Sequence, residues 1–159
     1  MLKVKIIAVG SLKEEYLRAA TAEYLKRLSA YCEVNLCELK EFRLPERPSD
    51  AEIAAALESE AGKILAEIPQ KAFTVTLCVE GKEYTSEQFA GFIDDVRMQS
   101  GTMCIIIGSS YGLSERVKQA SRARVSFSRM TFPHQLMRVI LLETVYRAFN
   151  IQKGTKYHK

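Results

Sequence analysis

The chain has 159 residues, of which 47% are hydrophobic and 26% are charged, and its formal net charge is +4. This length suits one domain, residues 1–159, which can bury roughly two-thirds of its unfolded surface in a single core. No run approaches the ~20 apolar residues of a membrane span or forms a signal-peptide core, so we expect a cytoplasmic protein without a membrane partner.

Apolar strand-like runs alternate with amphipathic helical stretches along the chain. Strands are expected at Lys3 to Val9, Glu33 to Glu38, Ala72 to Val79 and Met103 to Ile107. Helices are expected near Lys13 to Ser29, near Asp50 to Glu67 and after Thr85 or Ser86. This alternation predicts an α/β domain.

The first two helices each place apolar residues on one face, as helices that cover a sheet do. These residues are Tyr16, Leu17, Ala20, Tyr24 and Leu28 in the first helix, and Ile53, Leu57, Ala61, Ile64 and Leu65 in the second. Ser49 followed by Glu52 is typical of a capping box at the start of the second helix. The stretch from Lys40 to Pro48, with two prolines and mixed charges, predicts a surface loop.

Glycine turns follow two of the expected strands. Gly108 to Gly112 comes directly after the strand that ends at Ile107, where open α/β sheets commonly bind ligands. The GxxxG spacing matches neither GxGxxG nor the GxxxxGK[ST] phosphate loop, so a plain strand-to-helix turn explains it as well. The Glu80-Gly81-Lys82 turn is equally ambiguous.

The last expected helix, from about His134 to Ile151, differs from the others because apolar residues surround its whole circumference. Such a helix has to be buried on nearly all sides. One surface can cover the sheet while another meets a second subunit, which makes a homodimer the simplest accommodation. A fully buried helix in a monomer is the alternative.

Cysteine and histidine give little support for a metal site. Cys32, Cys37, Cys78 and Cys104 form no CxxC pair, and we expect all four to be reduced and structural. The two histidines are separated by 23 residues and belong to no HExxH or Cys/His cluster. We therefore expect no bound metal.

Charge is distributed unevenly along the chain. Residues 116–159 hold ten Lys and Arg, one Glu and both histidines, whereas residues 1–115 hold 13 Lys and Arg against 18 Asp and Glu. Clustered cations favour a phosphate-rich partner, because each contact with a phosphate releases condensed counterions. A solvated basic helix face explains the charge equally well, so the motifs in this segment have to decide.

Motifs follow one another in a specific order in the last third of the chain. They are Ile107-Gly108-x-x-x-Gly112-Leu113-Ser114, the segment SFSRMTFPHQLMR from Ser126 to Arg138, Glu143-x-x-Tyr146-Arg147-Ala148, and the terminal Tyr157-His158-Lys159. With Ile7 to Gly10 and the Gly81-Lys82 turn, they closely resemble the small bacterial SPOUT-superfamily methyltransferases that methylate N3 of a pseudouridine in 23S ribosomal RNA, using S-adenosylmethionine. The resemblance covers essentially the full length.

This resemblance implies a parallel sheet flanked by helices, a carboxyl-terminal trefoil knot and a homodimer that shares its active sites. Knots are so rare that topology rules normally exclude them, so the knot is expected from the resemblance alone. The spacing allows three loops to converge, Leu77 to Gly81, Gly108 to Leu113 and Phe127 to Phe132. The resemblance implies that they form the pocket for S-adenosylmethionine, lined by Leu77, Gly108, Phe127, Ser128, Arg129, Met130, Thr131 and Phe132. The implied partner is 23S rRNA, within the ribosome.

Three positions depart from the family pattern. Ser109 stands where the family usually has a second glycine, so we expect no close backbone contact with a ligand there. Thr144 stands where glutamine is frequent, and Lys156 where proline is frequent. These departures leave the conformation of the tail open.

Methyl transfer from a sulfonium donor is an in-line displacement, so donor and nucleophile have to be held close and collinear. The target nitrogen carries a proton at neutral pH, so a base has to remove it and a cation has to stabilise the negative charge that develops. His158 is the best candidate base, because histidine titrates near neutral pH, and Lys159 beside it can hold an RNA phosphate. A disordered basic tail is the alternative.

Four other residues are candidates for the catalytic site. Arg138 and Arg147 lie nine residues apart, about 180° around a helix, so one subunit can hardly use both at one spot, and a shared dimeric site removes this objection. Glu143 either serves the site or simply pairs with Arg147. Tyr157 either stacks on a base or anchors the tail by packing. We interpret His134 as structural or pocket-shaping.

Two other functions remain open. A non-enzymatic RNA-binding or ribosome-associated protein needs only the basic end of the chain. A flavodoxin-like nucleotide-binding module would use the Gly108 loop. Binding of S-adenosylmethionine separates the enzyme from the first, and bound flavin would identify the second.

Overall fold

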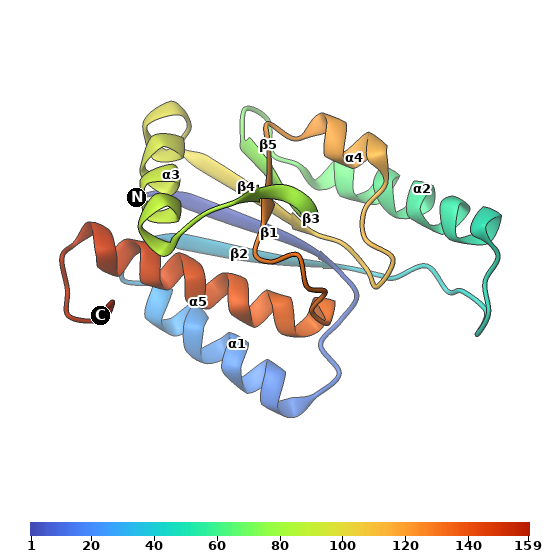
Figure 1. Ribbon diagram of the computed structural model, residues 1–159, viewed down its shortest axis with the longest axis horizontal. Helices are drawn as coiled ribbons and strands as arrows, with labels where there is room; N and C mark the ends of the chain where they lie inside the picture. Colours follow the sequence, from blue (N-terminus) through green and yellow to red (C-terminus); the bar gives the residue numbers. More distant parts are fainter.

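The computed structural model describes all 159 residues and contains one five-stranded sheet (Figure 1). Its strands are β1 (Lys3–Val9), β2 (Glu33–Leu39), β3 (Phe73–Glu83), β4 (Thr102–Ile107) and β5 (Ala123–Ser126). They lie in the order β2-β1-β4-β3-β5, and every neighbouring pair is parallel. The predicted α/β fold with a parallel sheet flanked by helices is confirmed.

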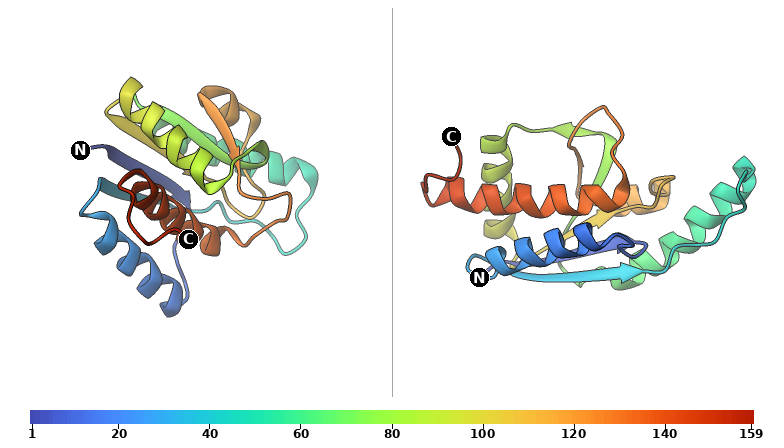
Figure 2. Two further views of the ribbon diagram at one scale, coloured as in Figure 1. Left: turned by 60° about the vertical axis from the view of Figure 1, so that its left-hand side comes forward. Right: turned by 90° about the horizontal axis from the view of Figure 1, so that it is seen from below.

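Helices cover both faces of the sheet (Figures 1 and 2). They are α1 (Glu15–Leu28), α2 (Asp50–Glu67), α3 (Ser86–Gln99), α4 (Glu115–Ala120) and α5 (His134–Gln152). On β1 the side chains alternate, so that Val4 and Ile6 join the core under α1, α3 and α5, while Ile7 and Val9 join the core under α2 and α4. The alternation explains why β1 is an unbroken apolar run.

Capping signals in the sequence mark where α2 and α3 begin. The Ser49 hydroxyl accepts a hydrogen bond from the Glu52 backbone N–H at 3.2 Å, and the Glu52 carboxylate accepts one from the Ser49 N–H at 3.2 Å. Thr85 and Gln88 form the equivalent pair ahead of α3. The predicted bounds of α2 and its capping box are therefore confirmed.

Other expectations were wrong or incomplete. Tyr16 is 68% exposed, so it does not belong to the buried face of α1. β3 continues to Glu83, through the Gly81 turn that was expected to follow it. Two short elements were not expected, α4 with six residues and β5 with four, because such short elements show little periodicity.

α5 lies beside both α1 and α3 (Figure 2). Its buried apolar residues are Leu141, Leu142, Val145, Ala148 and Phe149. Leu136 is 38% exposed, so a single chain does not bury the whole circumference. The homodimer and the knot stay predictions. No helix has the length and apolar character needed to cross a membrane.

Candidate active site

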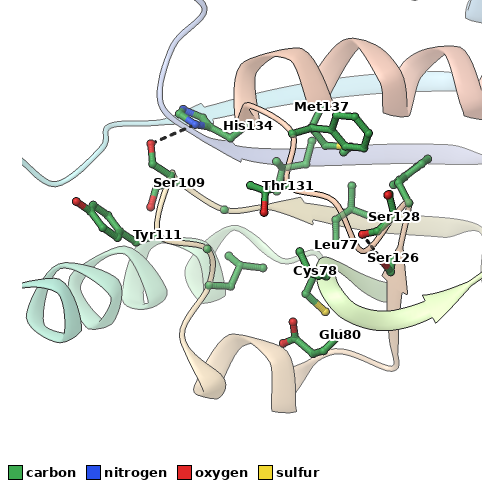
Figure 3. A pocket seen from close by; sticks show the side chains of 18 of the residues that line it. Leu77, Cys78, Glu80, Ser109, Tyr111, Ser126, Ser128, Thr131, His134 and Met137 are labelled. Atoms are coloured by element: carbon green, nitrogen blue, oxygen red, sulfur yellow. Dashed lines mark hydrogen bonds between the residues drawn. The ribbon is translucent and has the colours of Figure 1, made fainter. Parts of the chain in front are cut away.

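Three loops lie together beyond the carboxyl-terminal parts of β3, β4 and β5 and line a cavity of about 770 Å³ (Figure 3). Leu77 to Glu80, Ile107 to Leu113 and the segment from Val125 to His134 supply nearly all of the lining. The structure thus brings together the three loops expected from the sequence. The volume is that of a small-molecule site, for which roughly 300–1,000 Å³ is usual.

Close backbone packing shapes the loop after β4. A Cβ atom at Gly108 would lie 2.3 Å from the carbonyl oxygen of Gly112, so only glycine fits. Gly112 itself has a φ of +84°, in the region that favours glycine. The two glycines therefore allow the loop to fold back on itself, and the folded loop forms one wall of the cavity.

β3 makes a detour where it passes β5. Val125 pairs first with Leu77 and then with Lys82, so the residues between these two leave the regular ladder. A Cβ atom at Gly81 would lie 2.6 Å from the Val125 carbonyl carbon, which explains the glycine. The detour carries Cys78 and Glu80 to the cavity wall, where Glu80 forms an ion pair with Lys118.

The segment from Phe127 to Phe132 presents free backbone groups. None of its N–H or C=O groups makes a hydrogen bond to another backbone group. Side chains satisfy two of them, since the Ser126 hydroxyl donates to the Ser128 carbonyl at 3.0 Å and the Met130 N–H donates to the Ser128 hydroxyl at 3.0 Å. Because backbone N–H and C=O groups need hydrogen-bond partners when they are buried, the segment can bind a ligand that has both hydrogen-bond donors and acceptors. Arg129 is the one residue of the segment that does not line the cavity.

His134 begins α5 at the rim of the cavity (Figure 3). Its Nδ1 lies 3.4 Å from the Ser110 hydroxyl, so it connects α5 to the loop after β4. Burial lowers the pKa of His134, which favours the neutral ring. Its Nε2 is buried beside Gly10 and has no hydrogen-bond partner. These contacts agree with a pocket-shaping role.

Arg138, one turn further along α5, is completely buried. Its guanidinium donates to the Glu38 carboxylate at 2.8 Å and to the Gly10 carbonyl at 2.9 Å. It does not line the cavity. The structure therefore places this catalytic candidate between α5 and the ends of β1 and β2, where it joins three elements.

The carboxyl-terminal tail folds back onto the second half of α5. The Tyr157 hydroxyl donates to the Glu143 carboxylate at 2.9 Å, and burial together with this bond raises the pKa of Tyr157 to about 12. Its ring packs edge-on against Tyr146 at 4.9 Å and lies 4.8 Å from the Arg147 guanidinium. Tyr157 thus anchors the tail, one of the two roles considered for it.

Glu143 and Arg147 pair with each other, at 2.6 Å. This pairing raises the pKa of Arg147. A second nitrogen of the same guanidinium lies 3.2 Å from Nδ1 of His158, whose Nε2 lies 2.8 Å from the Glu87 carboxylate. Four of the five catalytic candidates therefore form one hydrogen-bonded cluster, which we call the tail cluster: Glu143, Arg147, Tyr157 and His158.

The tail cluster is separate from the cavity within one chain. None of its four residues lines the cavity. His134 and Arg147 lie 13 residues apart on α5, which corresponds to about 20 Å along the axis at 1.5 Å per residue. One chain by itself does not bring the two halves of the predicted site together.

Half of the cations in the basic segment are already neutralised. Arg116, Lys118, Arg124, Arg138 and Arg147 form ion pairs with carboxylates. The cations without such a partner are Arg122, Arg129, Lys153, Lys156 and Lys159. The charge available to a phosphate-rich partner is therefore smaller than the sequence suggests.

Several lining residues were not predicted. Ser110 and Tyr111 lie between the two glycines of a recognised loop, so their position was signalled. Cys78 and Glu80 lie within the expected loop from Leu77 to Gly81, although neither was named as a site residue, and Met137 required the direction in which α5 enters. No cluster of three or more His, Cys, Asp or Glu side chains suited to a metal ion occurs.

Comparisons with known proteins extend over the whole chain. A family model described as "Predicted SPOUT methyltransferase" matches residues 2–158. Curated proteins called "Ribosomal RNA large subunit methyltransferase H", from Streptococcus uberis and Listeria monocytogenes, are each 46% identical over 159 residues, covering 99% of this chain and 100% of their own length.

Similarity also extends to a solved structure, that of a probable methylase family protein from Haemophilus influenzae Rd KW20. Its TM-score is 0.56, with 12% sequence identity, and the match covers 98% of this chain and 70% of the other. At this identity the likeness concerns the fold alone.

Proposed function

Because the chain belongs to the SPOUT methyltransferase family, we propose that it methylates ribosomal RNA of the large ribosomal subunit. The family expected from the sequence is thereby confirmed. We assign S-adenosylmethionine as methyl donor and N3 of a pseudouridine in 23S rRNA as target. The assembled ribosome is the proposed substrate, which agrees with the expected cytoplasmic location.

The observation that carries this proposal is the cavity lined by the three loops. Apolar side chains such as Leu77, Ile107 and Leu113 form one part of its wall, while the free backbone groups of the segment from Phe127 to Phe132 form another. This combination fits a cofactor that has a flat ring with donors and acceptors at its edge. When bound, S-adenosylmethionine would supply a methyl group activated by its positively charged sulfur.

Residues that would hold this cofactor are Leu77, Gly108, Phe127, Ser128, Met130, Thr131 and Phe132. Arg129 lies between lining residues but does not line the cavity with them, so its expected place in the cofactor site stays a prediction. Its exposed guanidinium has no carboxylate partner and is free to contact an RNA phosphate.

A second copy of the chain would complete the site. Exposed apolar side chains gather at the cavity and at the start of α5, with Tyr111 48%, Met130 72%, Phe132 37% and Leu136 38% exposed. Such a patch is typical of a protein interface. The tail cluster, which lies outside the cavity of its own chain, would then face the cavity of the partner, as a homodimer with shared active sites requires.

Within this arrangement the tail cluster would receive the target nucleotide. Arg147 would stabilise negative charge on the target ring, with Glu143 and Tyr157 fixing its position. His158 would take the proton of the target nitrogen. Lys156 and Lys159 are exposed and would contact RNA phosphates. Arg138 would act from a distance, by holding α5 against the Gly10 turn.

The family's trefoil knot is part of the proposal. The close passage of Gly81 over Val125 supports a chain that is wrapped tightly around β5. A Cβ atom at Gly81 would have no room beside the Val125 backbone, as expected where two segments of the chain pass one another closely.

Calorimetry with S-adenosylmethionine tests the proposed cofactor. We expect saturable binding by the purified chain, and an absence of heat at millimolar cofactor would leave a non-enzymatic RNA-binding protein as the better reading. Mass mapping of 23S rRNA from cells with and without the gene tests the target. A methylated pseudouridine that persists without the gene would contradict it.

A further inference from the structure

Glu87 contacts the tail cluster from a different element. It lies in the first turn of α3, 71 residues before His158, and its carboxylate is 2.8 Å from Nε2 of that histidine. The contact lowers the pKa of Glu87, chiefly through the hydrogen bond itself. No site residue expected from the sequence lies on α3.

The capping box at the start of α3 fixes the backbone that carries the Glu87 carboxylate. The Thr85 hydroxyl accepts from the Gln88 N–H at 3.1 Å, and the Gln88 side chain accepts from the Thr85 N–H at 2.9 Å. This capping box fixes the first turn of the helix. The tail is thus tied at one end to α5, through Tyr157 and Glu143, and at the other to α3, through Glu87.

The two partners of His158 decide which ring nitrogen carries the proton. Arg147 can only donate hydrogen bonds, so Nδ1 of His158 has to accept from it, at 3.2 Å. The ionised Glu87 carboxylate can only accept, so Nε2 has to donate to it. Both contacts are satisfied together by one species, the neutral ring with its hydrogen on Nε2.

We propose that Glu87 is a positioning residue for His158, which holds the ring as its Nε2–H tautomer and leaves Nδ1 as the one nitrogen able to accept the target's proton. This rests on the proposed function of the site. It matches the logic of catalytic triads, in which a carboxylate orients a histidine through one nitrogen while the other takes the proton. Once the proton is on Nδ1, the Glu87 carboxylate stabilises the charged ring.

Arg147 occupies Nδ1 until the target arrives. Two of its nitrogens, Nε and Nη2, are bound to Glu143, and only Nη1 contacts the histidine. When the target N–H takes this place, its proton moves to Nδ1 and its electron pair stays on the target nitrogen. That pair would form the bond to the methyl carbon as the bond from this carbon to the sulfonium sulfur breaks and leaves its electron pair on sulfur. The released Nη1 then faces the negative charge on the target ring while Glu143 still holds the guanidinium.

The test uses the full-length protein labelled with ¹⁵N, in which only two histidines have to be assigned. In the wild type we expect a slowly exchanging Nε2–H proton on His158, identified by its loss in His158→Gln. Glu87→Ala should abolish this signal because the acceptor is gone, and Glu87→Gln should retain it because the amide oxygen still accepts. Asp95→Asn, which removes an exposed carboxylate from the same helix, is the control and should leave it unchanged.

Turnover provides the second readout. Because the Glu87 side chain is 64% exposed and therefore screened by water, we expect kcat to fall about tenfold in Glu87→Ala, with rescue to within about threefold in Glu87→Gln. An N–H signal that survives in Glu87→Ala, or a wild-type kcat there, would reduce the contact to a surface ion pair and overturn the proposal.

Failure of the proposed function would show itself separately. A chain that binds no S-adenosylmethionine in calorimetry would refute the assigned reaction. The N–H measurement is made on the free protein, so it still decides whether Glu87 fixes the ring of His158.

Discussion

The glycines of the chain differ in whether they have room for a side chain, and Gly108 in the cavity wall has none. At Gly108 an added Cβ would meet the Gly112 carbonyl oxygen at 2.3 Å, whereas at Gly91, exposed on α3, it would meet nothing within 4 Å. We predict that Gly108→Ala lowers the unfolding free energy by about 1–3 kcal/mol and weakens cofactor binding about tenfold, a loss of about 1.4 kcal/mol.

Gly91→Ala is the matched control for this substitution. It should raise the unfolding free energy by about 0.5–1 kcal/mol, because alanine favours the helix, and leave cofactor binding unchanged. Urea denaturation and calorimetry measure both quantities. Normal cofactor affinity in Gly108→Ala would show that the loop after β4 does not shape the binding site.

Glu60 is a buried carboxylate behind the same loop. It is 4% exposed, accepts a hydrogen bond from the Phe42 N–H at 3.1 Å and has no ion-pair partner. Burial is the largest cause that raises the pKa of Glu60 above its ordinary value of 4.5. The folded protein therefore holds a proton at Glu60 more tightly than the unfolded chain does.

This raised pKa predicts how stability depends on pH. The contribution of Glu60 is fully present below its unfolded-state pKa and is lost as the pH rises through its higher folded-state pKa. Glu60→Gln cannot ionise and keeps an acceptor for Phe42. As the pH rises from 4 to 7, we expect the unfolding free energy of Glu60→Gln to increase relative to that of the wild type. Parallel pH profiles of the two proteins in denaturant titrations would contradict this.

At the scale of elements, buried polar contacts join helices to the sheet, and those of Arg138 are the clearest example. It is fully buried and joins α5 to Glu38 at the end of β2 and to Gly10 after β1. We predict that Arg138→Lys lowers the unfolding free energy by about 1–3 kcal/mol, because a single ammonium cannot reproduce both bonds. Arg129→Lys, at an exposed position without a carboxylate partner, should change stability by less than about 0.5 kcal/mol.

Arg138→Lys also tests whether Arg138 holds α5 in place or takes part in the reaction. If Arg138 acts by holding α5, its lysine variant should lose stability and cofactor affinity together, and raising the cofactor concentration should recover turnover. An unchanged unfolding free energy with a large fall in kcat would instead assign Arg138 to the reaction.

Long elements with clear signals were predictable from the sequence, and short ones were not. α2 begins and ends where its capping box and periodicity indicate, and β1 matches its apolar run. β5 has four residues, and β3 changes register at Leu77, which no local pattern reports. Such features depend on the partner strand, which the sequence does not reveal.

The candidate site shows the same limit. The resemblance indicated three loops, and the structure places all three at the cavity. The same resemblance made Glu143, Arg147, Tyr157 and His158 catalytic candidates, and the structure places these four in one cluster. Glu87 could not be found this way, since its contact with His158 spans 71 residues and depends on where the tail folds back.

At the scale of the whole molecule, the exposed apolar surface predicts self-association. Leu136 lies on α5 beside the cavity rim and is 38% exposed, so changing it does not disturb the core of one chain. We expect the 18.0 kDa chain to sediment as a dimer. Leu136→Glu should sediment as a folded monomer that lacks methylation. Met98→Glu, at a residue of α3 that is 80% exposed and does not line the cavity, should remain dimeric and active.

A shared active site makes a sharper prediction, because the cavity of one chain and the tail cluster of the other would form each site. A chain with Gly108→Trp would lack a usable cavity, and a chain without Tyr157 to Lys159 would lack a usable tail while still binding cofactor. Each variant alone should be inactive. Mixed dimers would contain one site with both halves intact, so subunits exchanged at equal amounts should recover about a quarter of wild-type turnover, half of the dimers being mixed and each having one working site of two. If every chain instead used its own tail, no mixed dimer would contain a complete site, and the mixture would stay inactive even though light scattering showed dimers and calorimetry showed bound cofactor.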